Sequence, residues 1–158
     1  MVVLVLLALM VGLGVFHHYS LIVLMRVLPG WAHTHKLRAM PIFGGMAVVH
    51  ALEILAFAGV YVLLTATLWP DSFSPSFAGS FEDYVYFSAV MYTTLGYAPF
   101  DAEGPMRLIA AGQSLLGFMT LTWSATFLYS MCSDEWHEEA ERSKNGGKAG
   151  TETEGEEG

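Results

Sequence analysis

The stretch of sequence that decides the fold is AVMYTTLGYAPFDAEG, residues 89–104. It interrupts a strongly apolar chain with polar and small residues, and its Gly96 and Pro99 do not favour the continuation of a helix. Backbone that is neither helix nor barrel is tolerated at membrane depth only where it is buried in protein or lines water. The sequence on either side therefore determines what this stretch can be.

The composition is typical of a membrane protein rather than of a soluble domain. Of the 158 residues, 54% are hydrophobic and 14% are charged, and the mean hydropathy is +0.47. The net charge of -8 comes mostly from acidic residues between positions 134 and 157. No basic patch with interleaved aromatic residues is present, so we expect no nucleic-acid partner. Cys132 is the only cysteine, which excludes an intramolecular disulfide and a cysteine-based zinc site.

Three segments are long enough to cross a bilayer, for which about 20 apolar residues are needed. We place them at about residues 2–20, 41–69 and 106–131. Residues 21–31 are interpreted as an interfacial extension of the first span, stopped by Pro29 and Gly30. A cleaved signal peptide is the alternative for the N-terminus. It is disfavoured because no basic residues precede the apolar run, which is also too long.

A shorter helical segment begins at about residue 81 and is too short to span the bilayer. Ser80 is a predicted N-cap, and Glu82 and Asp83 follow in the first turn, where carboxylates complement the helix dipole. The segment therefore predicts a re-entrant helix that enters the membrane partway. The fold class is an all-α membrane protein with three transmembrane helices and this re-entrant helix.

Orientation follows from the basic residues. Arg26, Lys36 and Arg38 flank the first loop, whereas residues 70–105 contain no Lys or Arg. We expect a multi-pass protein of the cell (inner) membrane, with the N-terminus outside and the acidic tail in the cytoplasm.

Four copies of residues 94–98 around one axis would present rings of carbonyl oxygens that replace the hydration shell of a cation. Thr94 would add a hydroxyl to the ring. Gly96 would supply backbone freedom, because neighbouring residues must alternate between left-handed and right-handed conformations to turn successive carbonyls the same way.

The segment YFSAVMYTTLGYA, followed by RLIAAGQSLLGF, resembles the pore domain of the potassium channel superfamily, whose filter reads T-V-G-Y-G or T-x-G-Y-G. The arrangement of three spans is also similar to small bacterial three-span ion-channel proteins. The resemblance implies a homotetramer in the lipid bilayer whose filter coordinates K+. The implied ion-coordinating residues are Thr94, Leu95, Gly96, Tyr97 and Ala98. The implied supporting residues are Thr93, which precedes the filter, and the aromatic pair Tyr86 and Phe87, which packs around it.

The chain departs from this pattern at the end of the filter. Ala98 replaces the last glycine, and Pro99 replaces the acidic residue that normally follows and braces the filter. The outermost carbonyl ring is therefore in question, and Asp101 and Glu103 can replace only the electrostatic part of the bracing. We expect a potassium-preferring channel, with a non-selective channel for Na+ and K+ as the alternative.

His50 and Glu53 lie one turn apart in the middle of the second span. An ionisable residue within a span is by default a functional hypothesis. We interpret the pair as polar and hydrogen-bonded, with a modulatory role in sensing protons as one alternative. A membrane metal-binding or structural protein is another, but we expect no transition-metal site, because a single such motif is too few. Interfacial roles are expected for four further histidines: His17, His18, His33 and His35.

Small or polar residues recur down one face of the third span at spacings of 4, 3 and 4. These residues are Gln113, Gly117, Thr120 and Ser124. We expect them to line a water-filled cavity, with helix packing as the alternative. The resemblance further implies that residues 106–131 are the inner helix and that Gly117 lies near the glycine at which this helix bends. Leu128 and Met131 would continue the stripe as an apolar constriction.

The predicted organisation has three parts. Residues 1–39 form the first span and a basic loop, residues 40–131 form the pore domain, and residues 132–158 form a disordered tail. The predicted function is passive conduction of cations, with no enzymatic activity and no cofactor other than the permeant ion.

Overall fold

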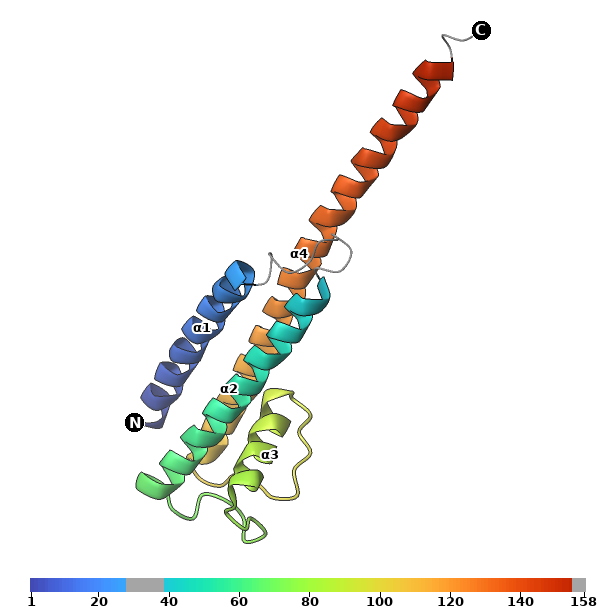
Figure 1. The fold of residues 1–158 in the computed structure, drawn as a ribbon. Helices are drawn as coiled ribbons and strands as arrows, with labels where there is room; N and C mark the ends of the chain where they lie inside the picture. The colour runs from blue at the N-terminus through green and yellow to red at the C-terminus, as the bar shows by residue number, and fades with distance from the viewer. Residues whose placement is uncertain (28–38, 155–158) are drawn as a thin grey trace.

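The computed structural model describes residues 1–27 and 39–154, which contain four helices (Figure 1). The helices are α1 (Val2–Val27), α2 (Ala39–Thr67), α3 (Phe81–Tyr92) and α4 (Met106–Glu154). Over these ranges the only extended pairing is an isolated bridge between Phe73 and Ala102. The predicted all-α fold, with three long helices and one short helix, is confirmed.

Three stretches of the described chain are long and apolar enough to cross a bilayer. They are Val2–Val27, Met40–Thr67 and Met106–Met131. These stretches match the three predicted spans, so the chain is a multi-pass membrane protein.

Helix α1 continues beyond the predicted end of the first span. It runs unbroken to Val27, because no proline occurs before Pro29 and the isolated glycines Gly12 and Gly14 are tolerated within a helix. Its last turns pack on α2, where buried Leu21 contacts Ile42 and Met46 in a small apolar cluster. The part predicted as an interfacial extension is therefore continuous with the spanning helix.

Helix α3 begins with the predicted N-cap. The backbone N–H of Asp83 donates to Ser80 Oγ at 3.2 Å, and the backbone N–H of Ser80 donates to Asp83 Oδ2 at 3.1 Å. This capping box fixes where the helix starts. The helix ends at Tyr92, whose hydroxyl reaches Glu53 in the middle of α2. The short helix therefore stops at about half the depth of the long helices, which is the predicted re-entrant arrangement.

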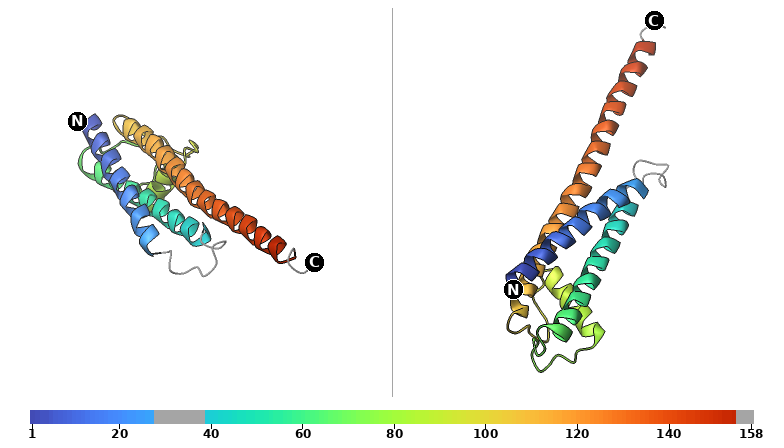
Figure 2. Two further views of the ribbon diagram at one scale, coloured as in Figure 1. Left: turned by 90° about the horizontal axis from the view of Figure 1, so that it is seen from above. Right: turned by 90° about the vertical axis from the view of Figure 1, so that its left-hand side faces the viewer.

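The start of α1, the end of α2, all of α3 and the start of α4 lie toward one end of the molecule (Figure 1). In the right-hand view of Figure 2, α1 runs obliquely across the other two long helices. Two glycines allow this crossing, because a Cβ at Gly112 of α4 would overlap Leu6 and one at Gly45 of α2 would overlap Leu24. The first span is thereby packed on both α2 and α4.

An aromatic core holds α3 between α2 and the loops. Phe87 of α3 is 1% exposed, and its ring centroid lies 5.2 Å from that of Tyr61 and 5.1 Å from that of Phe73. The non-helical residues 93–99 that follow α3 form the return segment. Phe100 comes directly after them and is also buried, with its ring centroid 5.9 Å from that of Phe87. Edge-to-face and tilted contacts of this kind stabilise the cluster beyond area burial alone.

The predicted disorder of the tail differs from the structure. Helix α4 continues past the membrane-spanning stretch to Glu154 (Figure 1). Residues 135–144 are rich in Glu, Ala, Arg and Lys, which are good helix formers, so a helix that has already nucleated in the membrane can propagate through them. The prediction placed too much weight on the glycines that follow.

Candidate functional site

The return segment starts with a defined helix end. Thr93 is the C-cap of α3, the N–H of Thr94 donates to Met91 O at 3.1 Å, and the N–H of Leu95 donates to Val90 O at 3.1 Å. These two bonds form a Schellman motif, in which the residue after the cap adopts the left-handed conformation. That residue is Thr94, with φ 57°.

The backbone then alternates. Gly96 has φ 70°, and among the non-glycine residues of the described ranges only Asp71 and Thr94 have positive φ. Positive φ at positions 94 and 96 is therefore separated by negative φ at Leu95, with negative φ again at Tyr97. This is the alternation that the sequence predicted for a segment whose carbonyls point the same way.

The large side chains of this segment are exposed in the single chain. Leu95 is 69% exposed and Tyr97 is 75% exposed. Of the two predicted supporting aromatic residues, Phe87 is buried in the core, whereas Tyr86 is 44% exposed. The segment and Tyr86 are thus exposed on the surface of the chain.

The outer end of the segment is braced by the loop before α3. The Ser76 hydroxyl donates to the carbonyl of Pro99 at 3.3 Å, and the backbone N–H of Asp101 donates to Ser74 Oγ at 3.0 Å. The N–H of Glu103 also donates to Ser72 O at 2.8 Å. Sequence reasoning missed these serines, because nothing in their spacing shows which part of the chain they will meet.

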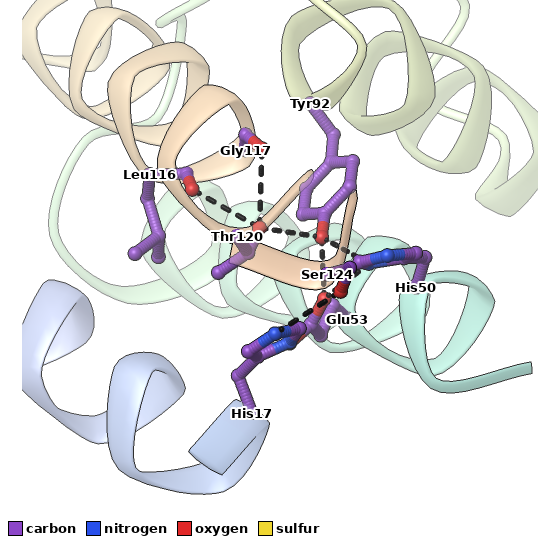
Figure 3. A network of polar contacts seen from close by, with 8 residues as sticks. All are labelled: His17, His50, Glu53, Tyr92, Leu116, Gly117, Thr120 and Ser124. Carbon is purple, nitrogen blue, oxygen red and sulfur yellow. Dashed lines mark hydrogen bonds and ion pairs between the residues drawn. The ribbon is translucent and has the colours of Figure 1, made fainter. Parts of the chain in front are cut away.

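A buried polar network lies at the C-terminal end of α3, around Tyr92 (Figure 3). Its centre is the Glu53 carboxylate of α2, which is 0% exposed. His17 Nδ1 of α1 lies 2.9 Å from Glu53 Oε1, and His50 Nδ1 lies 3.1 Å from Glu53 Oε2. The Tyr92 hydroxyl donates to Glu53 Oε2 and lies 2.7 Å from His50 Nδ1. The predicted His50–Glu53 pair is thus one part of a larger cluster.

Helix α4 completes the network. Thr120 Oγ1 lies 2.8 Å from the Tyr92 hydroxyl oxygen and donates to the carbonyl of Leu116 at 3.1 Å. Ser124 Oγ lies 3.3 Å from His17 Nε2. All four helices therefore contribute to one polar cluster. The residue from α3 is Tyr92, which directly precedes the return segment.

A second polar cluster anchors the middle of α3. Gln113 Nε2 donates to Ser88 O at 3.1 Å and to Ser88 Oγ at 2.8 Å, while its Oε1 accepts from the Tyr61 hydroxyl at 2.5 Å. Ser88 Oγ donates in turn to Ile54 O at 2.7 Å. Gln113 and Ser88 are fully buried, so these bonds satisfy polar groups that lack water.

The predicted cavity-lining stripe of α4 faces the interior of the protomer. Gln113, Thr120 and Ser124 are buried against α1, α2 and α3, and a Cβ at Gly117 would overlap the carbonyl oxygen of Tyr92. This corrects the prediction in favour of its alternative, helix packing. The periodicity identified the polar face, but a polar face can meet either water or another helix.

The remaining predicted residues have other places. Leu128 and Met131 are partly buried against the apolar cluster around Leu21, so they pack on α1 and α2 instead of continuing the stripe as a constriction. His18 is exposed beside Trp123, with ring centroids 5.8 Å apart. His33 and His35 lie outside the described residues.

This geometry defines a class of protein: a membrane protein whose short helix enters from one end, stops at mid-depth and returns through a non-helical segment. The sequence model of a family described as "Ion channel" matches residues 49–134, which is more than half of the chain. The chain therefore belongs to this ion channel family, and the predicted resemblance is confirmed at that level. No curated protein and no solved structure matches the chain.

Proposed function

We propose that four copies of this chain surround a common axis and form a passive, potassium-preferring cation channel without an enzymatic step. The observation that carries the proposal is the backbone of residues 94–97, in which positive φ at Thr94 and Gly96 alternates with negative φ. Such a backbone lets successive carbonyl oxygens replace the hydration shell of a cation.

The identity of Thr94 supports the same function. A β-branched residue with positive φ is an outlier, and the left-handed position after a helix usually carries glycine. Strain of this kind, of the order of 1–3 kcal/mol, persists mainly at functional sites. A threonine here keeps a hydroxyl next to the first carbonyls of the segment, where it can act as an additional oxygen ligand.

Electrostatics favour a cation at the same place. The C-terminus of a helix carries partial negative charge, and α3 ends directly before the segment. The residues between α2 and α4 include no Lys or Arg, and their five acidic residues attract cations to this end of the protein. These residues are Asp71, Glu82, Asp83, Asp101 and Glu103. In the proposed orientation this end faces outside the cell membrane, and the C-terminal part of α4 is cytoplasmic.

The substitution Gly96→Ala tests the proposed filter. Gly96 has φ 70°, so a Cβ would strain each subunit by roughly 1 kcal/mol and turn its carbonyls. We expect potassium flux into liposomes to fall by about tenfold or more, since this strain acts four times in one pore. The matched control is Gly59→Ala in α2, where a Cβ meets no atom within 4 Å. Unchanged flux in Gly96→Ala would exclude carbonyl coordination by this segment.

A non-selective cation channel is the second candidate, favoured by one observation. Ala98, at the position of the last filter glycine, is not among the described residues with positive φ. If the family geometry at this position requires positive φ, the outermost carbonyl of this chain is turned away from the axis, and one coordination site is lost. Loss of an outer site weakens the discrimination between K+ and Na+.

The substitution Ala98→Gly separates the two candidates. If the missing outer site limits selectivity, glycine restores the backbone freedom, and we expect the permeability ratio of K+ to Na+ to rise. Reversal potentials under bi-ionic conditions measure this ratio. Ala78→Gly in the preceding exposed loop is the control. A native channel that already excludes Na+ and does not respond to Ala98→Gly would eliminate the non-selective candidate.

A further inference from the structure

We propose that His17, His50 and Glu53 form a binding site for one divalent transition-metal ion of the Zn2+ type. The site joins α1 to α2 behind the end of α3 (Figure 3). It is separate from the proposed filter and does not depend on which ion the filter conducts. The sequence indicated no such site because it paired only His50 with Glu53, whereas the fold adds a third ligand from α1.

The ligand atoms already lie close together. One ligand atom from each of the three residues lies within 4.8 Å of the other two, with 2.9 Å between His17 Nδ1 and Glu53 Oε1 and 3.1 Å between His50 Nδ1 and Glu53 Oε2. In a tetrahedral zinc site with bonds of about 2.0–2.1 Å, neighbouring ligand atoms are about 3.3 Å apart. The two nitrogen–oxygen distances in the cluster are already close to this spacing.

The surrounding groups match a metal site. The Tyr92 hydroxyl lies 2.7 Å from His50 Nδ1 and donates a hydrogen bond to Glu53. At this position it can be a fourth ligand of the ion, or it can hold a water molecule that is the fourth ligand. Ser124 Oγ lies 3.3 Å from His17 Nε2, the nitrogen that is not used for ligation. Partners of this kind fix the ring orientation of ligating histidines.

Charge gives a reason for a cation at this position. Within the described ranges, the ion pairs of Glu53 are with His17 and His50, and its side chain is fully buried. A carboxylate in a membrane interior needs compensation. Two imidazole nitrogens and one carboxylate favour Zn2+ over the hard cations K+ and Ca2+, which prefer oxygen ligands alone.

The most accessible approach to the site is past His50. The His50 side chain is 15% exposed, whereas those of His17 and Glu53 are 0% exposed. We therefore expect slow binding and slow release, and a bound ion would hold α1 against α2 and Tyr92.

The test uses the full-length chain without a histidine tag, stripped with a chelator and reconstituted in nanodiscs. Zn2+ is titrated, excess ion is removed, and bound metal is measured by elemental mass spectrometry. We expect one Zn2+ per chain and a raised unfolding temperature. In His17→Ala and Glu53→Gln the affinity should fall by at least about tenfold.

Matched histidine variants serve as controls. His18→Ala removes an exposed neighbour on the same helix, and the double variant His33→Ala/His35→Ala removes the two histidines that lie between α1 and α2 in the sequence. Both should bind Zn2+ as the native chain does. Absence of zinc from the native chain, or unchanged affinity in His17→Ala and Glu53→Gln, would overturn the proposal.

A measurement on the native protein covers the case in which the variants fail to fold. X-ray absorption at the zinc edge should show two imidazole ligands per ion. A spectrum with fewer than two imidazoles would reject the site. None of these measurements depends on conduction, so they can fail independently of the proposed channel function.

Discussion

Tyr92 is the residue at which the polar network meets the return segment. Its hydroxyl donates to Glu53 and lies 2.8 Å from Thr120 Oγ1, while its backbone is followed by the C-cap of α3. Buried polar groups that lose a partner are costly because no water replaces it. Tyr92 therefore links the position of the segment to the packing of α2 and α4.

The substitution Tyr92→Phe should destabilise the protein without altering its shape. It removes one hydrogen-bond donor from the buried Glu53 carboxylate, at a cost of about 1–3 kcal/mol. The apparent unfolding temperature in detergent should fall by several degrees. Tyr129→Phe, at a position that is 67% exposed, should leave it unchanged. An equal unfolding temperature for Tyr92→Phe and the native chain would show that the network contributes nothing measurable.

At the residue scale, the sequence predicted local features better than long-range ones. The positive φ of Gly96 and the shared face of His50 and Glu53 follow from residue type and spacing. His17 lies 36 positions before Glu53, so only the crossing of α1 over α2 brings the two together. His17 was predicted to be interfacial, but it is buried against Glu53. The signal that could have identified it is an ionisable residue inside an apolar helix, since such a residue needs a partner.

At the scale of elements, α3 and α4 approach as closely as their backbones permit. Gly117 of α4 lies against the carbonyl of Tyr92, the last residue of α3. Small residues allow membrane helices to pack in this way. The contact sets the depth at which the short helix stops.

The substitution Gly117→Ala should therefore displace α3. The added Cβ would overlap backbone, which cannot move aside as a side chain can, and overpacking of this kind costs about 1–3 kcal/mol. We expect a lower unfolding temperature and reduced ion flux. Gly44→Ala in α2 is the control, since a Cβ there meets no atom within 4 Å. Native-like stability and flux in Gly117→Ala would show that the helices can separate freely.

Elements were predictable where a strong local signal marks their ends. Ser80 and Asp83 fixed the start of α3, and the apolar lengths fixed the three spans. The third span ends at Met131 as predicted, whereas helix α4 runs on to Glu154, and α1 runs to Val27, beyond the predicted end of the first span. Hydropathy marks where a helix leaves the membrane and not where it stops being helical. Whether the polar stripe of α4 lines a cavity or packs on another helix could not be predicted, because a single sequence does not show which helix lies against that face.

At the scale of the whole molecule, a single chain leaves large apolar side chains uncovered around the return segment. Leu95 and Tyr97 of the segment and Tyr86 of α3 are all exposed. Exposed apolar patches mark interaction surfaces. In the proposed tetramer these side chains would meet the neighbouring subunits.

The mass of the protein in detergent tests this arrangement. Light scattering coupled to size exclusion should give about four times the chain mass of 17.3 kDa after subtraction of the detergent. Gly96→Ala should give the same mass, so that its loss of flux reports on the filter and not on dissociation. A protein that remains a single chain at all concentrations would rule out the shared axis.

The placement of Glu53 also constrains how the chain enters the membrane during synthesis. A charged side chain at the centre of a span raises the insertion cost by about 2.5–3.5 kcal/mol. His17 precedes it in the chain and lies in α1, so a partner is already in place when the ribosome delivers α2. Thr120 and Ser124 belong to α4, which is synthesised last, so they join the cluster only after the final span has been inserted into the membrane. The order of the helices in the chain therefore provides the Glu53 carboxylate with a partner from α1 before α2 is inserted, and with the remaining polar groups once α4 follows.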